Sequence, residues 1–143
     1  MKKFFLSVIF TIILGIFVGK ELCTTISAKE YKTLYILEIG SYLDYNDALR
    51  DTSMINNKII MKDSSSYDVY IGASFNKSNL NKLMKIYKKY NFTYFIKEEE
   101  IRDKEFIKNM NNFDLIMKSS KKNSDILEIN GIILSYFEEK FIK

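Results

Sequence analysis

The spacing of apolar residues changes twice along the chain, and each pattern is typical of a different kind of element. The chain opens on an apolar run over residues 4–18 that follows Lys2 and Lys3. From residue 33 to residue 97, strand-like apolar runs are interspersed with segments in which apolar residues recur every three or four positions. Beyond residue 97 the helical spacing prevails. These patterns predict an N-terminal membrane segment, a mixed region of strands and helices, and a helical end.

The opening segment predicts a signal anchor or transmembrane helix over residues 1–21, followed by a linker over 22–32. Positive charge before an apolar run keeps the N-terminus in the cytoplasm, so we expect a single-pass protein of the cell membrane whose C-terminal domain is extracytoplasmic. Two alternatives remain open. A cleaved signal would need small residues at alternating positions, for which residues 26–28 are the nearest match, and a lipoprotein would use Cys23.

The region from residue 33 to residue 97 contains a weak internal repeat, in which each unit places a glycine after a strand and a helix after the glycine. The first unit predicts a strand over 33–39, Gly40, a helix over 44–54 and a strand over 58–62. The second predicts a strand over 67–71, Gly72, a helix over 78–90 and a strand over 92–97. Both glycines are expected at strand ends, where the chain turns toward a helix.

Two such units give the order β-α-β-β-α-β, the split βαβ arrangement of the ferredoxin-like folds. The fold class is therefore α+β: a four-stranded antiparallel sheet with two helices on one side, preceded by the transmembrane helix and followed by an αα-hairpin. Alternate strand residues face opposite sides of a sheet. If Leu37, Ile39, Val69 and Ile71 face the helices, then Ile36, Glu38, Asp68 and Tyr70 lie on an open face.

The end of the chain, residues 98–143, predicts a C-terminal helical hairpin. The acidic run Glu98-Glu99-Glu100 is interpreted as a solvated linker or a helix start. Asp103 is expected to cap the first helix and Ser124 the second. Each helix has one apolar stripe, made of Phe106, Met110, Phe113 and Met117 in the first and Ile126, Ile129, Ile133 and Phe137 in the second.

Two strand motifs resemble those of a known family. The stretch Tyr35-Ile36-Leu37-Glu38-Ile39-Gly40-Ser41-Tyr42 is similar to the opening strand of the sporulation-related repeat (SPOR) domain, and Tyr67-Asp68-Val69-Tyr70-Ile71-Gly72 is similar to its second signature strand. The resemblance covers about residues 33–97, which we interpret as a SPOR-like domain. It departs from the family at Glu38 and Asp68, where the family has Gln and Arg, so the open face is more acidic here.

The resemblance implies binding of peptidoglycan, in particular of glycan strands stripped of their stem peptides (denuded strands), during cell division or sporulation. A sugar site needs flat rings for stacking and short polar groups for hydroxyls. Tyr70 and Phe95 can supply the rings, and Glu38 and Ser41 the polar groups. Together with Ile36 on the same face, these four residues are the predicted ligand-binding set.

Composition narrows the chemistry further. The chain has no His, Trp or Pro and one Cys. It therefore cannot form a disulfide within itself, assemble a Cys/His metal site or use a nucleophile paired with His. We therefore expect no cofactor and no metal. We also expect no enzyme activity, because the carboxylates Glu38 and Asp68 on a shallow sheet lack the pocket that glycoside hydrolysis requires.

Charge bears on the partner. The net charge is +4, but several of the cations flank the apolar segment, and the rest of the chain is nearly balanced. Nucleic acid is therefore not an expected partner. The alternative to glycan binding is a non-catalytic module that binds another envelope protein and has lost its affinity for glycan. The two differ in whether the terminal hairpin leaves the Ile36 and Tyr70 face open.

Overall fold

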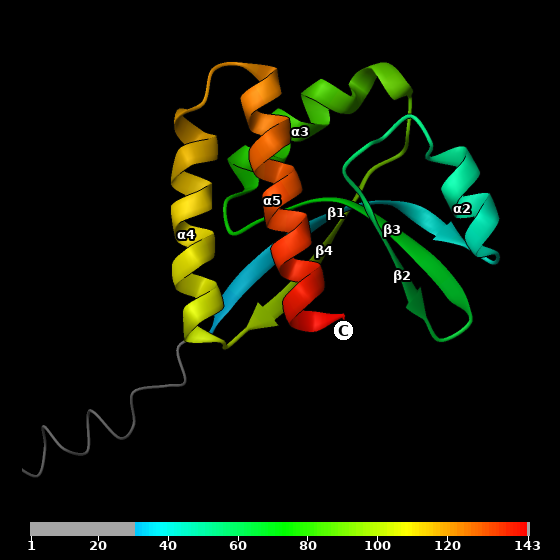
Figure 1. The fold of residues 1–143 in the computed structure, drawn as a ribbon, viewed down its shortest axis with the longest axis horizontal. Coiled ribbons are helices and arrows are strands. Elements are labelled where there is room, and N and C mark those ends of the chain that lie inside the picture. The colour runs from blue at the N-terminus through cyan, green and yellow to red at the C-terminus, as the bar shows by residue number, and fades with distance from the viewer. Residues whose placement is uncertain (1–30, 143) are drawn as a thin grey trace, which may run out of the picture. The chain divides into compact units, whose positions relative to one another are not determined.

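The computed structural model describes residues 31–142, in which a sheet and its helices are followed by two long antiparallel helices (Figure 1). In chain order the elements are β1 (Lys32–Tyr42), α2 (Tyr45–Asp51), β2 (Ile59–Asp63), β3 (Ser66–Ser74), α3 (Lys77–Tyr87), the 3-10 turn η1 (Lys88–Tyr90), β4 (Phe95–Ile101), α4 (Lys104–Ser119) and α5 (Asn123–Phe141). The predicted signal anchor and nearly all of the linker lie outside the described residues. Within residues 31–142, the helices are too short or too polar to cross a bilayer.

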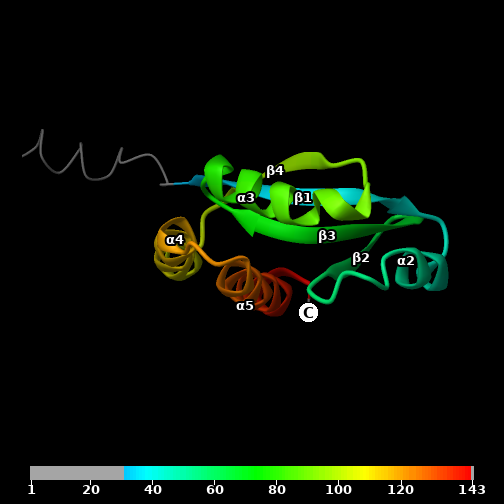
Figure 2. The same ribbon diagram turned by 90° about the horizontal axis from the view of Figure 1, so that it is seen from above.

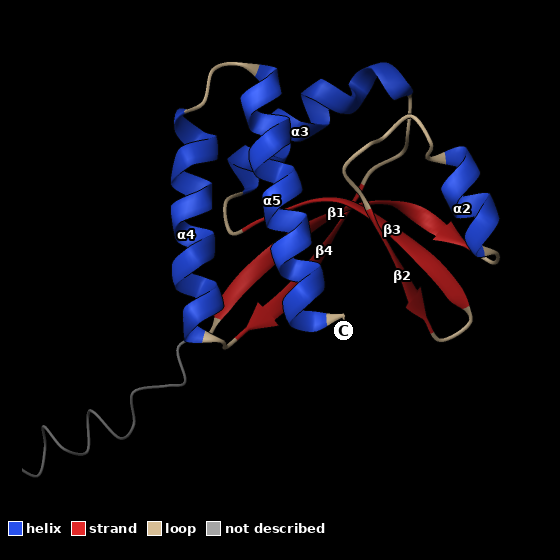
Figure 3. Ribbon diagram, in the orientation of Figure 1, coloured by secondary structure: helices blue, strands red, loops and turns tan. Residues whose placement is uncertain are grey.

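The four strands form one antiparallel sheet in the order β2-β3-β1-β4 (Figure 3). This is the order of a split βαβ fold, in which each crossover helix joins two strands that are separated by a third. The α+β class and the four-stranded antiparallel sheet are thus confirmed. The motif strands β1 and β3 lie side by side at its centre, so the two halves of the repeat meet directly.

The helices α2 and α3 begin at side-chain caps, because Asp44 accepts hydrogen bonds from the amides of Asn46 and Asp47, and Asn76 accepts one from Ser78. Both helices pack on the same side of the sheet. Tyr45 of α2 contacts the ring of Tyr67, and Leu83 of α3 lies over Gly72. The residues predicted to face the helices, Leu37, Ile39, Val69 and Ile71, are all buried.

The two repeated glycines lie inside strands, so the prediction of turns at strand ends is wrong. Gly40 has a φ of +143° at an irregularity of β1, a conformation that residues with a Cβ rarely adopt. Gly72 pairs with Leu37 in the middle of the sheet. A Cβ at this position would lie 2.7 Å from Cδ1 of Leu83, so the glycine allows α3 to pack closely.

The acidic run is part of the sheet. The strand β4 begins three residues later than predicted and continues through Glu98, Glu99 and Glu100, which pair with Tyr35, Leu34 and Thr33 of β1. The interpretation as a linker or helix start is therefore wrong. The long strand β1 offers partners to this segment, and Lys77, Lys97 and Arg102 each lie within 4 Å of one of the three glutamates.

The terminal hairpin is confirmed as two helices, with one cap as predicted. Asp103 accepts a hydrogen bond of 2.8 Å from the amide of Phe106 at the start of α4. Ser124, however, does not cap α5, because the helix begins at Asn123, two residues before the start that a Ser124 cap predicts. The Ser124 hydroxyl donates to Asp125 instead. Residues 31–143 form one compact unit, so the hairpin belongs to the same body as the sheet.

Helix α5 lies beside the part of β3 that extends past β2 (Figure 2). β2 pairs with β3 only from Ser66 to Tyr70. Next to this stretch, the side-chain amide of Asn130 on α5 donates to the carbonyl of Ile71. The buried side chains of α4 and α5, among them Phe106, Met110 and Phe137, join the same core cluster as the strands.

Candidate functional site

The strand register brings three of the predicted site residues into one row. Glu38 of β1 pairs with Tyr70 of β3 on one side and with Phe95 of β4 on the other. Residues directly opposite in antiparallel strands point to the same side of a sheet, so these three side chains are neighbours. Ser41 pairs with Asp68 in a second row, and Ile36 pairs with Lys97 in a third. The residues Glu38, Ser41, Asp68, Tyr70, Phe95 and Lys97 form what we call the Glu38 cluster.

Hydrogen bonds connect the polar members of the cluster. The Ser41 hydroxyl donates to Asp68 over 2.6 Å and lies 3.5 Å from a Glu38 carboxylate oxygen. Because one hydroxyl has one proton, the short contact to Asp68 is the hydrogen bond. The Lys97 ammonium donates to the Tyr70 hydroxyl over 3.2 Å, and it also forms an ion pair with Glu99.

The electrostatics of the cluster follow from this arrangement. Burial raises the pKa of Glu38 above its ordinary value of 4.5, and the neighbouring Asp68 carboxylate raises it further. Burial also raises the pKa of Tyr70. The hydrogen bond to Tyr70 raises the pKa of Lys97. The site is thus a shallow polar surface that holds one carboxyl in a partly desolvated position.

The members of the predicted set differ in how far a ligand can reach them. Phe95 is 56% exposed and Ser41 is exposed, whereas Glu38 is half-buried. Ile36 and Tyr70 are each only 1% exposed, so the expectation that they lie on an open face is wrong.

The hairpin explains why one end of this face is closed. Lys32, Leu34, Ile36 and Glu38 alternate on one side of β1, and the Lys32 ammonium hydrogen-bonds to Asn111 of α4. The hairpin therefore reaches this side of the sheet at the start of β1. The accessible part of the cluster is a strip at the other end of the strand, made of Phe95, Glu38, Ser41 and Lys97.

Sequence reasoning did not include Lys97 among the site residues. The alternation of β4 contains the signal, because Phe95 and Lys97 are two positions apart and so share a side of the strand. Asp68 was recognised on the same face as Glu38 but was not assigned to the site. Its role in the structure is to accept the hydrogen bond of Ser41.

Comparison with known proteins adds one likeness. No protein-family model matches the chain, and no curated protein matches it. Among solved structures, it is similar to the solution structure of the peptidoglycan binding domain of the B. subtilis cell wall lytic enzyme CwlC, with 24% sequence identity and a TM-score of 0.41. The match covers 48% of this chain and 91% of that chain. A TM-score of 0.41 is too low for this likeness to support an argument about the ligand. The fold assignment rests on the strand order of the sheet.

Proposed function

We propose that the chain is a non-catalytic module of the cell envelope that binds peptidoglycan glycan strands through the accessible strip of the Glu38 cluster. The observation that carries this proposal is the position of Phe95, an exposed ring directly opposite Glu38, which itself lies beside Ser41. A flat ring beside a carboxyl and a hydroxyl has the composition of a sugar-binding surface. The similarity of β1 and β3 to the SPOR signature strands supports the same ligand.

The cluster suits binding better than catalysis. Glu38 and Asp68 lie on neighbouring strands, but Ser41 donates to Asp68 and lies beside Glu38, so the space between the two carboxylates is filled. Glycoside hydrolysis needs room for a sugar between two carboxyl groups. We therefore assign the two carboxylates to binding and to fixing the geometry of the strip.

Co-sedimentation with amidase-treated peptidoglycan tests the proposal, using residues 31–143, which form one compact unit. We expect the wild-type fragment to sediment with the denuded strands and Phe95→Ala to weaken binding by about 1–3 kcal/mol, a range typical of lost stacking. Tyr31→Ala is the matched control, because Tyr31 is also an exposed ring but lies outside the sheet. A wild-type fragment that stays in the supernatant would contradict glycan binding.

We further propose that residues 1–21 anchor the chain in the membrane with the domain outside, at sites of division or sporulation. The basic pair before the apolar run supports this orientation. Cys23, the single cysteine, provides the test, since a thiol reagent that cannot cross membranes should label it in intact cells. Labelling that appears only after lysis would place the domain in the cytoplasm.

A second candidate function is that of a module that binds another envelope protein. One observation favours it: the hairpin exposes Leu115, Ile116 and Ile132 while it closes part of the sheet face. Exposed apolar groups of this kind are common at protein interfaces. If the wild-type fragment stays in the supernatant in co-sedimentation, and Leu115→Asp abolishes recovery of a cross-linked envelope partner, this candidate replaces the first.

A further inference from the structure

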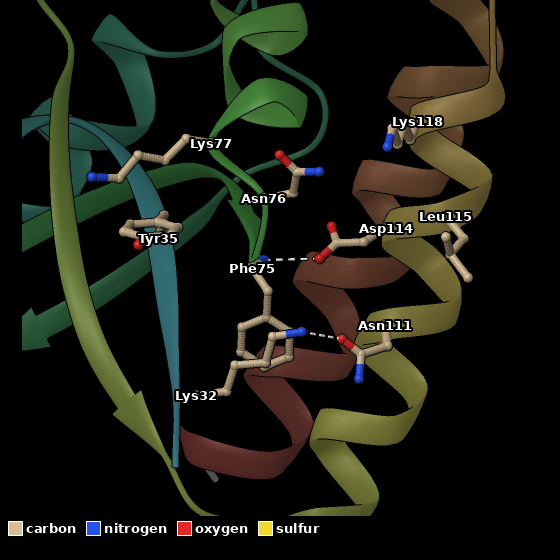
Figure 4. Close-up of a pocket in the computed structure, with 9 residues that line it drawn as sticks. All are labelled: Lys32, Tyr35, Phe75, Asn76, Lys77, Asn111, Asp114, Leu115 and Lys118. Carbon is tan, nitrogen blue, oxygen red and sulfur yellow. Dashed lines mark hydrogen bonds between the residues drawn. The ribbon is translucent and has the colours of Figure 1, made fainter. Parts of the chain in front are cut away.

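A pocket of about 550 Å³ lies between the start of β1, the junction of β3 with α3, and the middle of α4 (Figure 4). Three lysines line it, each from a different element: Lys32 from β1, Lys77 from α3 and Lys118 from α4. The amide side chains of Asn76 and Asn111 complete its polar wall. The volume is in the range of small-molecule sites. The pocket lies at the opposite end of β1 from the Glu38 cluster.

Two of these lysines are held in place by aromatic rings. The Lys32 ammonium lies 4.6 Å from the centre of the Phe75 ring, and the Lys77 ammonium lies 4.4 Å from the centre of the Tyr35 ring. Such contacts reduce the freedom of an ammonium group before a ligand arrives. Each ammonium also covers one face of its ring, and that face is closed to stacking on a sugar or a base.

The buried carboxylate at the base of the pocket is engaged by the protein. Asp114 accepts hydrogen bonds from the Ser74 hydroxyl, the main-chain amide of Phe75 and the Asn79 side chain. It thereby fastens α4 to the turn before α3. Because its oxygens already have these partners, Asp114 shapes the site. Lys118 is exposed, whereas Lys32 donates to Asn111 and Lys77 forms an ion pair with Glu98.

Lys118 also lines a second pocket of about 490 Å³, between the end of α3 and the turn that joins α4 to α5. Lys82, Lys85 and Lys121 line this pocket too, and the described residues around it include no carboxylate. Lys82 donates to the carbonyls of Met117, Lys118 and Ser120, so it caps α4. Lys85, Lys118 and Lys121 are exposed. The two pockets share Lys118 and thus form one basic stripe.

We infer that this stripe, Lys32, Lys77, Lys118, Lys85 and Lys121, binds a polymer that carries repeated phosphate groups. Two adjacent basic pockets with a shared lysine fit a ligand with several anionic groups better than a single anion. Single-stranded nucleic acid is disfavoured among such polymers, because its binding uses aromatic rings that stack on bases. Tyr35 and Phe75 are the aromatic residues that line these two pockets, and a lysine covers one face of each. This inference does not depend on the proposed glycan site.

Calorimetric titration of the full chain in neutral detergent tests the inference, with a short polyphosphate as the probe. We expect binding that weakens steeply between about 50 and 200 mM salt, as counterions compete for the lysines. The triple variant Lys85→Gln, Lys118→Gln, Lys121→Gln should bind about tenfold or more weakly, and Lys118→Gln alone should lower the salt slope by about one. Lys82 is left unchanged because it caps α4.

The matched control replaces three exposed lysines outside the stripe, Lys62, Lys104 and Lys108, by Gln. This variant should bind polyphosphate like wild type, and both triple variants should keep the wild-type melting temperature. Inorganic phosphate should bind more weakly than the polymer. Equal affinity for both, tighter binding of an oligonucleotide, tighter binding of micelles doped with phosphatidylglycerol, or an equal loss in the two triple variants would each overturn the inference.

Discussion

The side-chain amide of Asn130 on α5 donates a hydrogen bond of 2.8 Å to the main-chain carbonyl of Ile71 on β3. Both residues are fully buried. The carbonyl belongs to the part of β3 that extends past β2, so the helix supplies a donor there. A polar residue in the apolar stripe of a helix thereby links the hairpin to the sheet.

Replacing Asn130 by Ala should lower the free energy of unfolding by about 1–3 kcal/mol, because a buried carbonyl loses its hydrogen-bond partner. Urea denaturation followed by circular dichroism measures the change. Asn112→Ala on the exposed side of α4 is the control and should have little effect. Equal stability of the two variants would show that the hydrogen bond does not stabilise the hairpin.

Phe106 is the centre of the aromatic packing between the sheet and the hairpin. Its ring is fully buried and lies within 6.4 Å, centre to centre, of the rings of Phe75, Tyr136 and Phe141. Phe106→Ala should therefore lower the free energy of unfolding by about 3–5 kcal/mol. Phe95→Ala, which removes an exposed ring, should cost far less. If Phe106→Ala melts at the same temperature as Phe95→Ala, the hairpin does not stabilise the sheet domain.

Gly72 is needed for the close contact between β3 and α3. The Cβ of Gly72→Ala would lie 2.7 Å from Cδ1 of Leu83, and relieving this overlap should cost about 1–3 kcal/mol. The same substitution should cost less in a Leu83→Ala background, because the overlapping atom is then absent. Thermal unfolding of the four proteins in a double-mutant cycle measures the coupling. A coupling of zero would show that Leu83 does not set the constraint, and Asn130, whose Oδ1 would lie 3.3 Å from the new Cβ, would be the next candidate.

The raised pKa of Glu38 predicts how stability depends on pH. Since the folded protein holds the Glu38 proton more tightly than the unfolded chain, whose ordinary pKa is 4.5, Glu38 makes stability fall as pH rises above that value. Glu38→Gln has no such loss. Its stability relative to wild type should therefore increase from about pH 4 to about pH 7 in urea denaturation. An equal difference at both pH values would contradict the prediction.

The cause of this shift can be tested separately. Asp68 is the second largest influence after burial, so Asp68→Asn should lower the pKa of Glu38 toward its ordinary value. Nuclear magnetic resonance titration of the Glu38 side-chain carboxyl carbon measures this directly. An unchanged midpoint in Asp68→Asn would mean that burial accounts for the whole shift.

The sequence by itself determined the elements and their order. Alternation along β1 and β3, the helical spacing of Leu80, Leu83 and Tyr87, and the cap at Asp103 are local signals, so they can be recognised without knowledge of the fold. From this alternation, Glu38, Tyr70 and Phe95 are expected on one face of the sheet. The strand pairing confirms this, because Glu38 pairs with Tyr70 on one side and with Phe95 on the other.

The tertiary structure decided what no local pattern contains. The strand β4 extends over Glu98 to Glu100 because β1 is long enough to pair with them, and this partner is more than sixty residues away in the chain. The burial of Ile36 and Tyr70 likewise depends on packing between distant segments, including the approach of the hairpin to this side of β1. Exposure is a property of the assembled surface, whereas periodicity reports only which side of an element a residue occupies.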